Sequence, residues 1–190
     1  MMYQFEDYVK ADFRKEKVLS KVFLIRKWSF LWIDPIGDRR YVVKYIFALR
    51  HVEYYMDRMN SVNNPFQKSI YQIKIFYWLS KLRKLSYITQ FQIPPFTVGK
   101  CLVIWHWGPI IINPKTRIGE NCTLNPMVVI GHKNPGEGAP RIGNNVFIGA
   151  GSKIIGNIHI GNNVTIGQNV VITNDIPDNA IIVSQKPRIL

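Results

Sequence analysis

The chain has 190 residues, which favours one or two domains, and 47% of them are hydrophobic, enough for a sizeable core. Its two cysteines, Cys101 and Cys122, give neither a disulfide framework nor a zinc-binding spacing, so we expect a reducing, cytoplasmic setting and no bound metal. No apolar run approaches the roughly 18 residues of a membrane span, and the first residues do not resemble a signal peptide.

The net charge of +13 is concentrated in the first half of the chain. Residues 1–92 hold 17 Lys and Arg against 8 Asp and Glu, a net +9, whereas residues 93–190 hold 8 against 4, a net +4. A basic field favours anionic partners such as phosphates, nucleic acid or an acidic bilayer face. Because no nucleic-acid-binding motif accompanies the charge, we expect no nucleic-acid partner.

Two helices are predicted in residues 1–92, one between Arg40 and Met59 and one between Pro65 and Tyr87. Apolar residues recur in each at steps of three and four, and predicted breaks at 34–37 and 63–65 precede them. The first stripe is Val42, Ile46, Leu49 and Val52, and the second is Phe66, Ile70, Ile73, Phe76 and Leu79. Two interpretations of this aromatic half stay open: its helices pack against one another, or a basic amphipathic segment makes peripheral contact with an anionic membrane.

A six-residue period runs through residues 93–190. Its leading aliphatic positions are Ile112, Ile118, Leu124, Ile130, Ile142, Ile148, Ile154, Ile160, Ile166 and Ile172. Four residues after most of them comes a small or β-branched residue: Thr116, Cys122, Val128, Val146, Ser152, Val164 or Val170. A period of six fits neither an α-helix nor a flat strand. It predicts a β-helix in which each hexad forms one short side of a coil and the aliphatic residues stack inside.

One polar segment, residues 132–141, interrupts the repeat without disturbing its count. It is rich in Gly and Pro, so we expect it to leave the coil as a loop, and loops on rigid scaffolds often carry binding groups. His132 and Glu137 in this loop are candidate substrate contacts. The repeat ends at Ile172, and residues 175–190 are predicted to form a C-terminal cap.

His106 stands six residues before Ile112, where the repeat predicts an aliphatic residue, between Trp105 and Trp107. Breaks of a local rule concentrate at functional sites. A neutral imidazole can accept a proton from a hydroxyl near neutral pH, so His106 is a candidate general base. The alternative is a structural histidine that caps the first coil.

Residues 104–108, 142–156 and 160–171 resemble the hexapeptide-repeat acyltransferases, in their serine acetyltransferase branch. Residues 175–180 and 186–189 are similar to the ending of that family. The resemblance implies an α+β protein, with a helical N-terminal region (1–92) followed by a left-handed parallel β-helix (93–190). It also implies a homotrimer that transfers an acetyl group from acetyl-coenzyme A (acetyl-CoA), bound in a groove between neighbouring subunits.

The resemblance assigns roles to individual residues. His106 matches the catalytic histidine of the family. Seven residues are implied as contacts of acetyl-CoA: Gly131, Gly149, Ala150, Gly151, Gln168, Lys186 and Arg188. Independently of the resemblance, Trp105 and Trp107 flank His106 and join the two loop residues as candidate substrate contacts. Turn formation is the alternative role of each glycine.

Several departures from serine acetyltransferases concern the acceptor. Ala139 stands where that branch has a second histidine, Gln92 lies in the segment that carries its orienting aspartate, and Trp105 replaces the aspartate before the catalytic histidine. The chain is in these respects more similar to the acetyltransferases of capsular and colanic-acid-type polysaccharide synthesis. We therefore expect an acetyl-CoA-dependent O-acetyltransferase acting on a sugar hydroxyl in surface polysaccharide biosynthesis, at the inner face of the membrane. Serine O-acetylation for cysteine synthesis and a non-catalytic scaffold are the alternatives.

Overall fold

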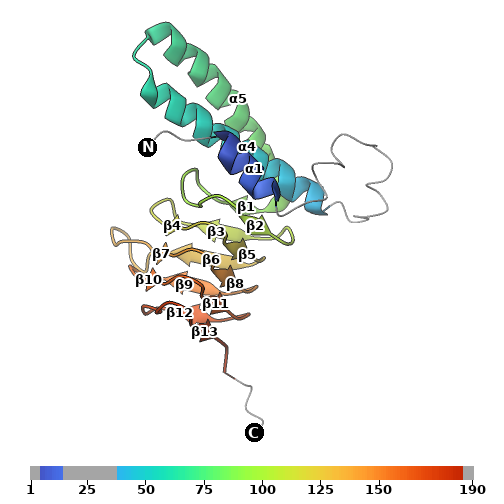
Figure 1. Cartoon of the computed structure of the whole chain (residues 1–190). Coiled ribbons are helices and arrows are strands. Elements are labelled where there is room, and N and C mark those ends of the chain that lie inside the picture. Colours follow the sequence, from blue (N-terminus) through green and yellow to red (C-terminus); the bar gives the residue numbers. More distant parts are fainter. Residues whose placement is uncertain (1–4, 15–37, 186–190) are drawn as a thin grey trace. The chain divides into compact units, whose positions relative to one another are not determined.

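The structure, a computed structural model, describes residues 5–14 and 38–185 (Figure 1). The chain divides into two compact units, residues 1–91 and residues 92–190. In the first unit the described elements are the helices α1 (Phe5–Arg14), α4 (Asp38–Ser61) and α5 (Pro65–Thr89). The helical character predicted for this half is confirmed, while the predicted break at 34–37 lies outside the described residues. Among the helices described, none is long and apolar enough to cross a membrane.

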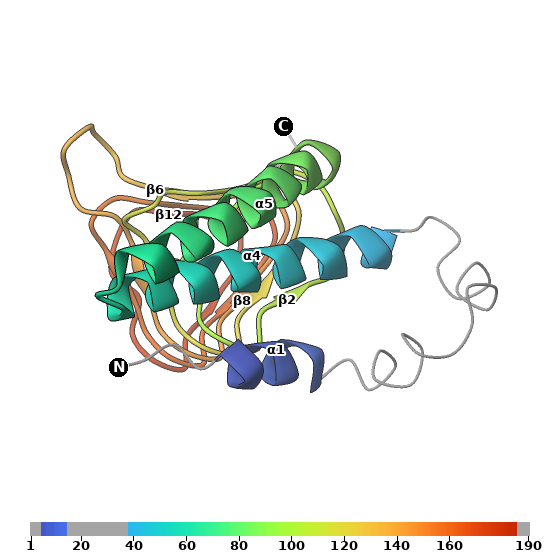
Figure 2. The same ribbon diagram turned by 90° about the horizontal axis from the view of Figure 1, so that it is seen from above.

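Helices α4 and α5 form an antiparallel pair and lie side by side in both views (Figures 1 and 2). The break predicted at 63–65 is confirmed. Asn64 caps α5, because its Oδ1 accepts hydrogen bonds from the backbone N–H groups of Phe66 (2.9 Å) and Gln67 (3.4 Å). Pro65 follows at the first helical position, where no N–H is needed.

The two predicted apolar stripes have opposite outcomes. Val42, Ile46, Leu49 and Val52 of α4 are all buried, as predicted. The stripe in α5 is not a packing face, because Phe66, Ile73 and Phe76 are exposed. Of the two interpretations, packing against the other helices is therefore wrong for these residues, and membrane contact stays a prediction. The residues of α5 that are buried are Ile75, Leu82 and Thr89, on the other side of the helix. Helix α5 carries apolar residues on two faces, and the period alone does not reveal which of them packs.

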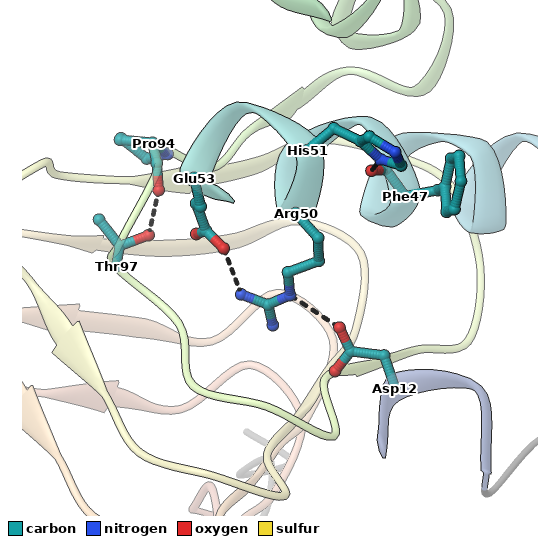
Figure 3. Close-up of polar contacts among 7 residues, drawn as sticks. All are labelled: Asp12, Phe47, Arg50, His51, Glu53, Pro94 and Thr97. Atoms are coloured by element: carbon teal, nitrogen blue, oxygen red, sulfur yellow. Dashed lines mark hydrogen bonds and ion pairs between the residues drawn. The ribbon is translucent and has the colours of Figure 1, made fainter. Parts of the chain in front are cut away.

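A buried ion cluster joins α1 to α4 (Figure 3). The guanidinium of Arg50 donates from Nε to Asp12 Oδ2 (2.7 Å) and from Nη1 to Glu53 Oε2 (2.9 Å), and it lies 4.9 Å from the ring centre of Tyr8. The three charged side chains are almost completely shielded from solvent. Charges at such depth need their partners, so the cluster fixes the position of α1 on α4.

His51 is a packing residue between α4 and α5. Its ring stacks on Trp78 with centroids 3.9 Å apart, and its Nδ1 lies 2.8 Å from the carbonyl oxygen of Phe47, which accepts a hydrogen bond (Figure 3). Burial lowers the pKa of the His51 imidazole. The hydrogen bond to the Phe47 carbonyl opposes this effect without cancelling it, and nearby Lys81 adds a smaller lowering. The neutral ring suits an aromatic stack.

The second unit is a parallel β-helix whose short strands form three sheets, and the predicted fold class is confirmed. Sheet A contains, in spatial order, β1 (Phe91–Gln92), β3 (Ile110–Ile112), β6 (Val128–Gly131), β9 (Lys153–Ile155) and β12 (Val171–Ile172). Sheet B contains β10 (His159–Ile160), β7 (Arg141–Ile142) and β4 (Arg117–Ile118). Sheet C contains β13 (Ile181–Ile182), β11 (Thr165–Ile166), β8 (Phe147–Ile148), β5 (Thr123–Leu124) and β2 (Val103–Ile104).

The interior of the β-helix contains the residues that the period predicts. All ten leading aliphatic residues are buried, and so are all seven small or β-branched residues. Ile130, Ile154 and Ile172 stack in register in sheet A. Cys122 is buried with its Sγ 3.3 Å from the carbonyl oxygen of Gly143, and burial raises the pKa of its thiol. It packs as a small apolar residue, as expected.

A column of asparagines occupies the corner between sheets B and C. Asn121, Asn145, Asn163 and Asn179 all have positive φ, between 56° and 62°, a conformation that asparagine tolerates better than most residues. Each side-chain amide donates to the next: Asn121 to Asn145, Asn145 to Asn163 (3.0 Å) and Asn163 to Asn179 (3.1 Å). The column therefore serves both the turn and the stacking of coils.

Candidate functional site

His106 lies in an enlarged corner between sheets C and A. Residues in register are 18 apart in the regular coils, as for Ile148 and Ile166. They are 20 apart across the first corner, where Ile104 pairs with Leu124. Residues 105–109 therefore contain a two-residue insertion. Ile104 takes the stacked position, and the prediction that His106 occupies an inward slot is wrong, because His106 is exposed.

The corners between sheets C and A stack into one continuous edge. Met127 N donates to Pro109 O (2.5 Å), Gly151 N to Pro126 O (3.0 Å) and Asn169 N to Ala150 O (2.8 Å). These bonds connect residues 105–109, 125–127, 149–152 and 167–170 level by level. We call this set the His106 edge. It brings together seven residues of the predicted site: Trp105, His106, Trp107, Gly149, Ala150, Gly151 and Gln168. Met127, an exposed neighbour on the same edge, was not among the predicted site residues.

The small residues of this edge differ in what they offer a ligand. Gly149 is buried, and a Cβ added there would come within 2.6 Å of the backbone of Gly167. Gly151 is also buried and has φ +74°, which favours glycine. Close packing of the coils explains both glycines. Ala150 is half-buried and Gln168 is exposed, so these two side chains are accessible to a ligand lying along the edge.

The loop residues lie at a different corner, between sheets A and B. We call residues 113–116, 131–140, 156–158 and 173–175 the His132 edge. Asn113 Nδ2 lies 2.6 Å from His132 Nδ1, and Asn113 Oδ1 accepts a hydrogen bond from the backbone N–H of Lys115 (2.9 Å). The amide NH2 of Asn113 is thus the donor to His132, which assigns the ring proton of His132 to Nε2. Asn113, which directly follows the in-phase Ile112, was not among the predicted site residues.

Glu137 closes the loop of the His132 edge. Its Oε1 accepts a hydrogen bond from Asn134 Nδ2 (2.6 Å), its Oε2 accepts one from Asn134 N (3.3 Å), and its own N–H donates to Asn134 O (3.2 Å). Two residues later, Ala139 is buried. The carboxylate of Glu137 therefore has a local structural partner, and its contact with substrate stays a prediction.

The two edges are separate within one chain. Each strand of sheet A runs from the His106 edge to the His132 edge, and the four residue steps from Pro109 to Asn113 span roughly 13 Å. The structure therefore does not bring Gly131, His132 or Glu137 together with His106. Lys186 and Arg188, two of the predicted contacts of acetyl-CoA, lie outside the described residues.

Comparison with known proteins identifies the family. Residues 139–174 match the model of the bacterial transferase hexapeptide family (six repeats). The serine acetyltransferase of Helicobacter pylori (strain ATCC 700392 / 26695) is 34% identical over 118 residues, which cover 60% of this chain and 69% of the relative. The putative colanic acid biosynthesis acetyltransferase WcaB of Escherichia coli (strain K12) is 38% identical over 94 residues, which cover 49% of this chain and 58% of the relative.

Solved structures agree on the fold. The crystal structure of Neisseria gonorrhoeae serine acetyltransferase (CysE) matches with a TM-score of 0.61 and 22% identity, over 96% of this chain and 63% of that chain. A serine acetyltransferase solved in complex with CoA matches with a TM-score of 0.62 and 21% identity, over 93% of this chain and 66% of that chain. This chain thus spans about two thirds of the length of these proteins.

The chain belongs to the hexapeptide-repeat family of acyltransferases, close to the serine acetyltransferases and to the WcaB-type acetyltransferase. The repeat and the structural neighbours fit a left-handed β-helix, as the resemblance implied.

Two glycine substitutions separate a packing role from a ligand role. A Cβ on Gly131 would meet only Asn113 Cβ, at 3.8 Å, whereas a Cβ on Gly149 would collide with backbone. We expect Gly149→Ala to lower the free energy of unfolding by about 1–3 kcal/mol and Gly131→Ala to leave it unchanged, as measured by urea unfolding. If Gly131 contacts acetyl-CoA, Gly131→Ala raises the KM for acetyl-CoA. An unchanged KM would contradict that contact.

Proposed function

We propose that this protein is an acetyl-CoA-dependent O-acetyltransferase and that His106 is its general base. The observation that carries the proposal is the position of His106. It is an exposed histidine in an enlarged corner, on the same edge of the β-helix as Ala150 and Gln168. The names of the relatives, all acetyltransferases, support the same class of reaction.

The proposed reaction is a direct transfer. The imidazole of His106 accepts the proton of the acceptor hydroxyl while the hydroxyl oxygen attacks the thioester carbonyl carbon. The resulting oxyanion is stabilised by a backbone N–H donor. The carbon–sulfur bond then breaks, the coenzyme A thiolate takes the proton from the His106 imidazolium, and an O-acetyl ester is left on the acceptor. The ligand arm of acetyl-CoA lies along the His106 edge, past Ala150 and Gln168.

Serine is the acceptor that the comparisons favour. The relatives named serine acetyltransferase include one that matches over 69% of its own length, and the structural neighbours bear the same name. Serine O-acetylation is therefore at least as well supported by the relatives as transfer to a sugar.

A sugar hydroxyl is the acceptor that the local residues favour. Trp105 is 61% exposed beside His106, and a broad indole face can pack against the apolar face of a sugar ring. Ala139, buried on the His132 edge, offers no polar group to an amino-acid substrate. The match to a putative colanic acid biosynthesis acetyltransferase points in the same direction.

A homotrimer would complete the site. The outward face of sheet A carries the exposed Ile111 and Val171 and the half-buried Val129, with Lys153 in register between Val129 and Val171. Its three apolar side chains are suited to contact with another copy. An arrangement in which the His132 edge of one copy faces the His106 edge of the next would unite the two sets of site residues, which one chain keeps apart.

The test is release of coenzyme A thiol from acetyl-CoA by the purified chain, with L-serine and a panel of sugars and oligosaccharides as separate acceptors. Turnover with serine alone would identify a cysteine-pathway enzyme and reject the sugar. Turnover with a sugar alone would reject serine and assign Trp105 a direct role, which Trp105→Ala then tests through the KM for that sugar. No turnover with any acceptor, from a folded chain, would favour a non-catalytic scaffold.

A further inference from the structure

Helix α5 exposes an apolar surface on the side opposite to its contact with α4. We call Phe66, Ile73, Phe76, Tyr77 and Tyr87 the α5 outer face; their exposed fractions are 73%, 71%, 75%, 51% and 82%. At 100° per residue all five fall within about a third of the helix circumference. The buried residues Ile75 and Leu82 lie on the opposite side. A helix that is apolar on both sides is expected to be covered on both.

The charge of α5 has a single sign. The helix contains Lys68, Lys74, Lys81, Arg83 and Lys84 and no Asp or Glu. By the same helical angles, Lys74 and Lys81 flank the outer face on one side, Arg83 flanks it on the other, and Lys84 lies within it. Lys81 lies 4.3 Å from the ring centre of Tyr77, so cation and aromatic ring are adjacent on the surface. Among the described residues, no carboxylate forms an ion pair with any of these cations.

The combination of apolar side chains and cations on the α5 outer face indicates which kind of partner can cover it. A second copy joined through the same face would place the two sets of cations against each other, which is unfavourable. An anionic bilayer can bind both the apolar side chains and the cations of this face. Apolar side chains enter the boundary between headgroups and acyl chains, while lysine and arginine reach lipid phosphates. Tyrosine is also enriched at that depth.

We propose that the α5 outer face docks this protein onto an anionic membrane surface, with α5 lying in the plane of the bilayer. The helix is 25 residues long, roughly 38 Å. Lys74, Lys81 and Arg83 flank the apolar face and Lys84 lies within it. This arrangement suits a position on the membrane rather than across it. This proposal is independent of the acetyl acceptor and of the role of His106.

The test is co-sedimentation of the purified full chain with vesicles. Vesicles of phosphatidylcholine and phosphatidylglycerol are compared with vesicles of phosphatidylcholine alone, at low and high salt. We expect binding to the anionic vesicles at low salt, and weakening as salt screens the cations. The double variant Ile73→Gln, Phe76→Gln is expected to reduce binding about tenfold or more. Lack of binding by the folded wild-type chain at low salt would overturn the proposal.

Matched controls distinguish binding through the α5 outer face from nonspecific hydrophobic binding and from binding that depends only on net charge. Ile181→Gln removes an equally exposed apolar side chain (75%) from the β-helix and is expected to leave binding unchanged. Lys81→Gln with Lys84→Gln is expected to weaken binding more than Lys115→Gln with Lys133→Gln, although the change in net charge is the same. The proposal would be overturned if Ile181→Gln reduced vesicle binding as much as Ile73→Gln, Phe76→Gln does. It would also be overturned if the two pairs of lysine substitutions weakened binding equally. A further result would also overturn the proposal: the wild-type chain self-associates as its concentration rises, and the double variant Ile73→Gln, Phe76→Gln loses this self-association but still binds vesicles. A second copy of the chain, not a membrane, would then cover the α5 outer face.

Discussion

Replacement of His106 by alanine is expected to lower kcat for acetyl transfer by about 10²- to 10⁴-fold, the usual contribution of a positioned general base. The side chain is exposed in a corner of the β-helix, so its removal leaves no cavity in the core. We therefore expect the variant to unfold at the same urea concentration as the wild type. The measurement is initial-rate kinetics with whichever acceptor supports turnover.

His159 provides a matched control. It too is an exposed histidine, and it lies on the outer side of strand β10 in sheet B, away from the His106 edge. His159→Ala is expected to keep wild-type kcat and KM. A His106→Ala variant with unimpaired kcat would contradict the assignment of the base. It would shift attention to His132, whose Nδ1 is already engaged by Asn113.

Replacement of Arg50 by methionine is expected to lower the free energy of unfolding of the helical unit by about 3–5 kcal/mol. Methionine keeps much of the volume of the arginine stem but removes the positive charge, so the carboxylates of Asp12 and Glu53 stay buried without their cation. The loss is measured by urea unfolding followed through the helical circular dichroism signal. Part of it is expected as detachment of α1, because Arg50 connects α4 to Asp12 of that helix.

A compensated variant tests the physical reason. Asp12→Asn with Glu53→Gln in the Arg50→Met background removes the unpaired charges and keeps the shapes. We expect it to recover part of the lost stability, since buried ion clusters cost about as much to desolvate as their attraction returns. If Arg50→Met costs less than about 1 kcal/mol, a value usual for surface pairs, the cluster does not hold α1 in place.

The repeat made most of the β-helix predictable from sequence, because two residues in every six, the leading aliphatic and the small or β-branched residue four later, must face a narrow interior. Helix α4 was predictable for a similar reason: only one of its faces is apolar and buried. The packing face of helix α5 was not predictable, because the helix has apolar residues on both sides. Ile75 on one side is buried and Phe76 on the other is exposed, and the sequence pattern does not distinguish them.

The site was harder to predict than the fold. The loop at 132–140 adds six residues to its coil, so that Ile118 pairs with Ile142 at a separation of 24 and the count survives. The corner at 105–109 adds only two, and a count by sixes then places His106 where Ile104 belongs. Residue type made His106 a candidate base, but its position in space did not follow from the period. The separation of Gly131, His132 and Glu137 from His106 depends on which corner each occupies.

The 18-residue register limits how this fold can change its length. Removal of residues 143–160 would join Ile142 to Gly161 and align Asn121 with Asn163, so the interior and the asparagine column would continue unbroken. The same deletion would remove the level of the His106 edge that contains Ala150 and shorten that edge by about 4.8 Å, the distance between neighbouring strands. The number of coils therefore sets the length of the His106 edge, and a gain or loss of one coil would change the length of ligand that could lie along it.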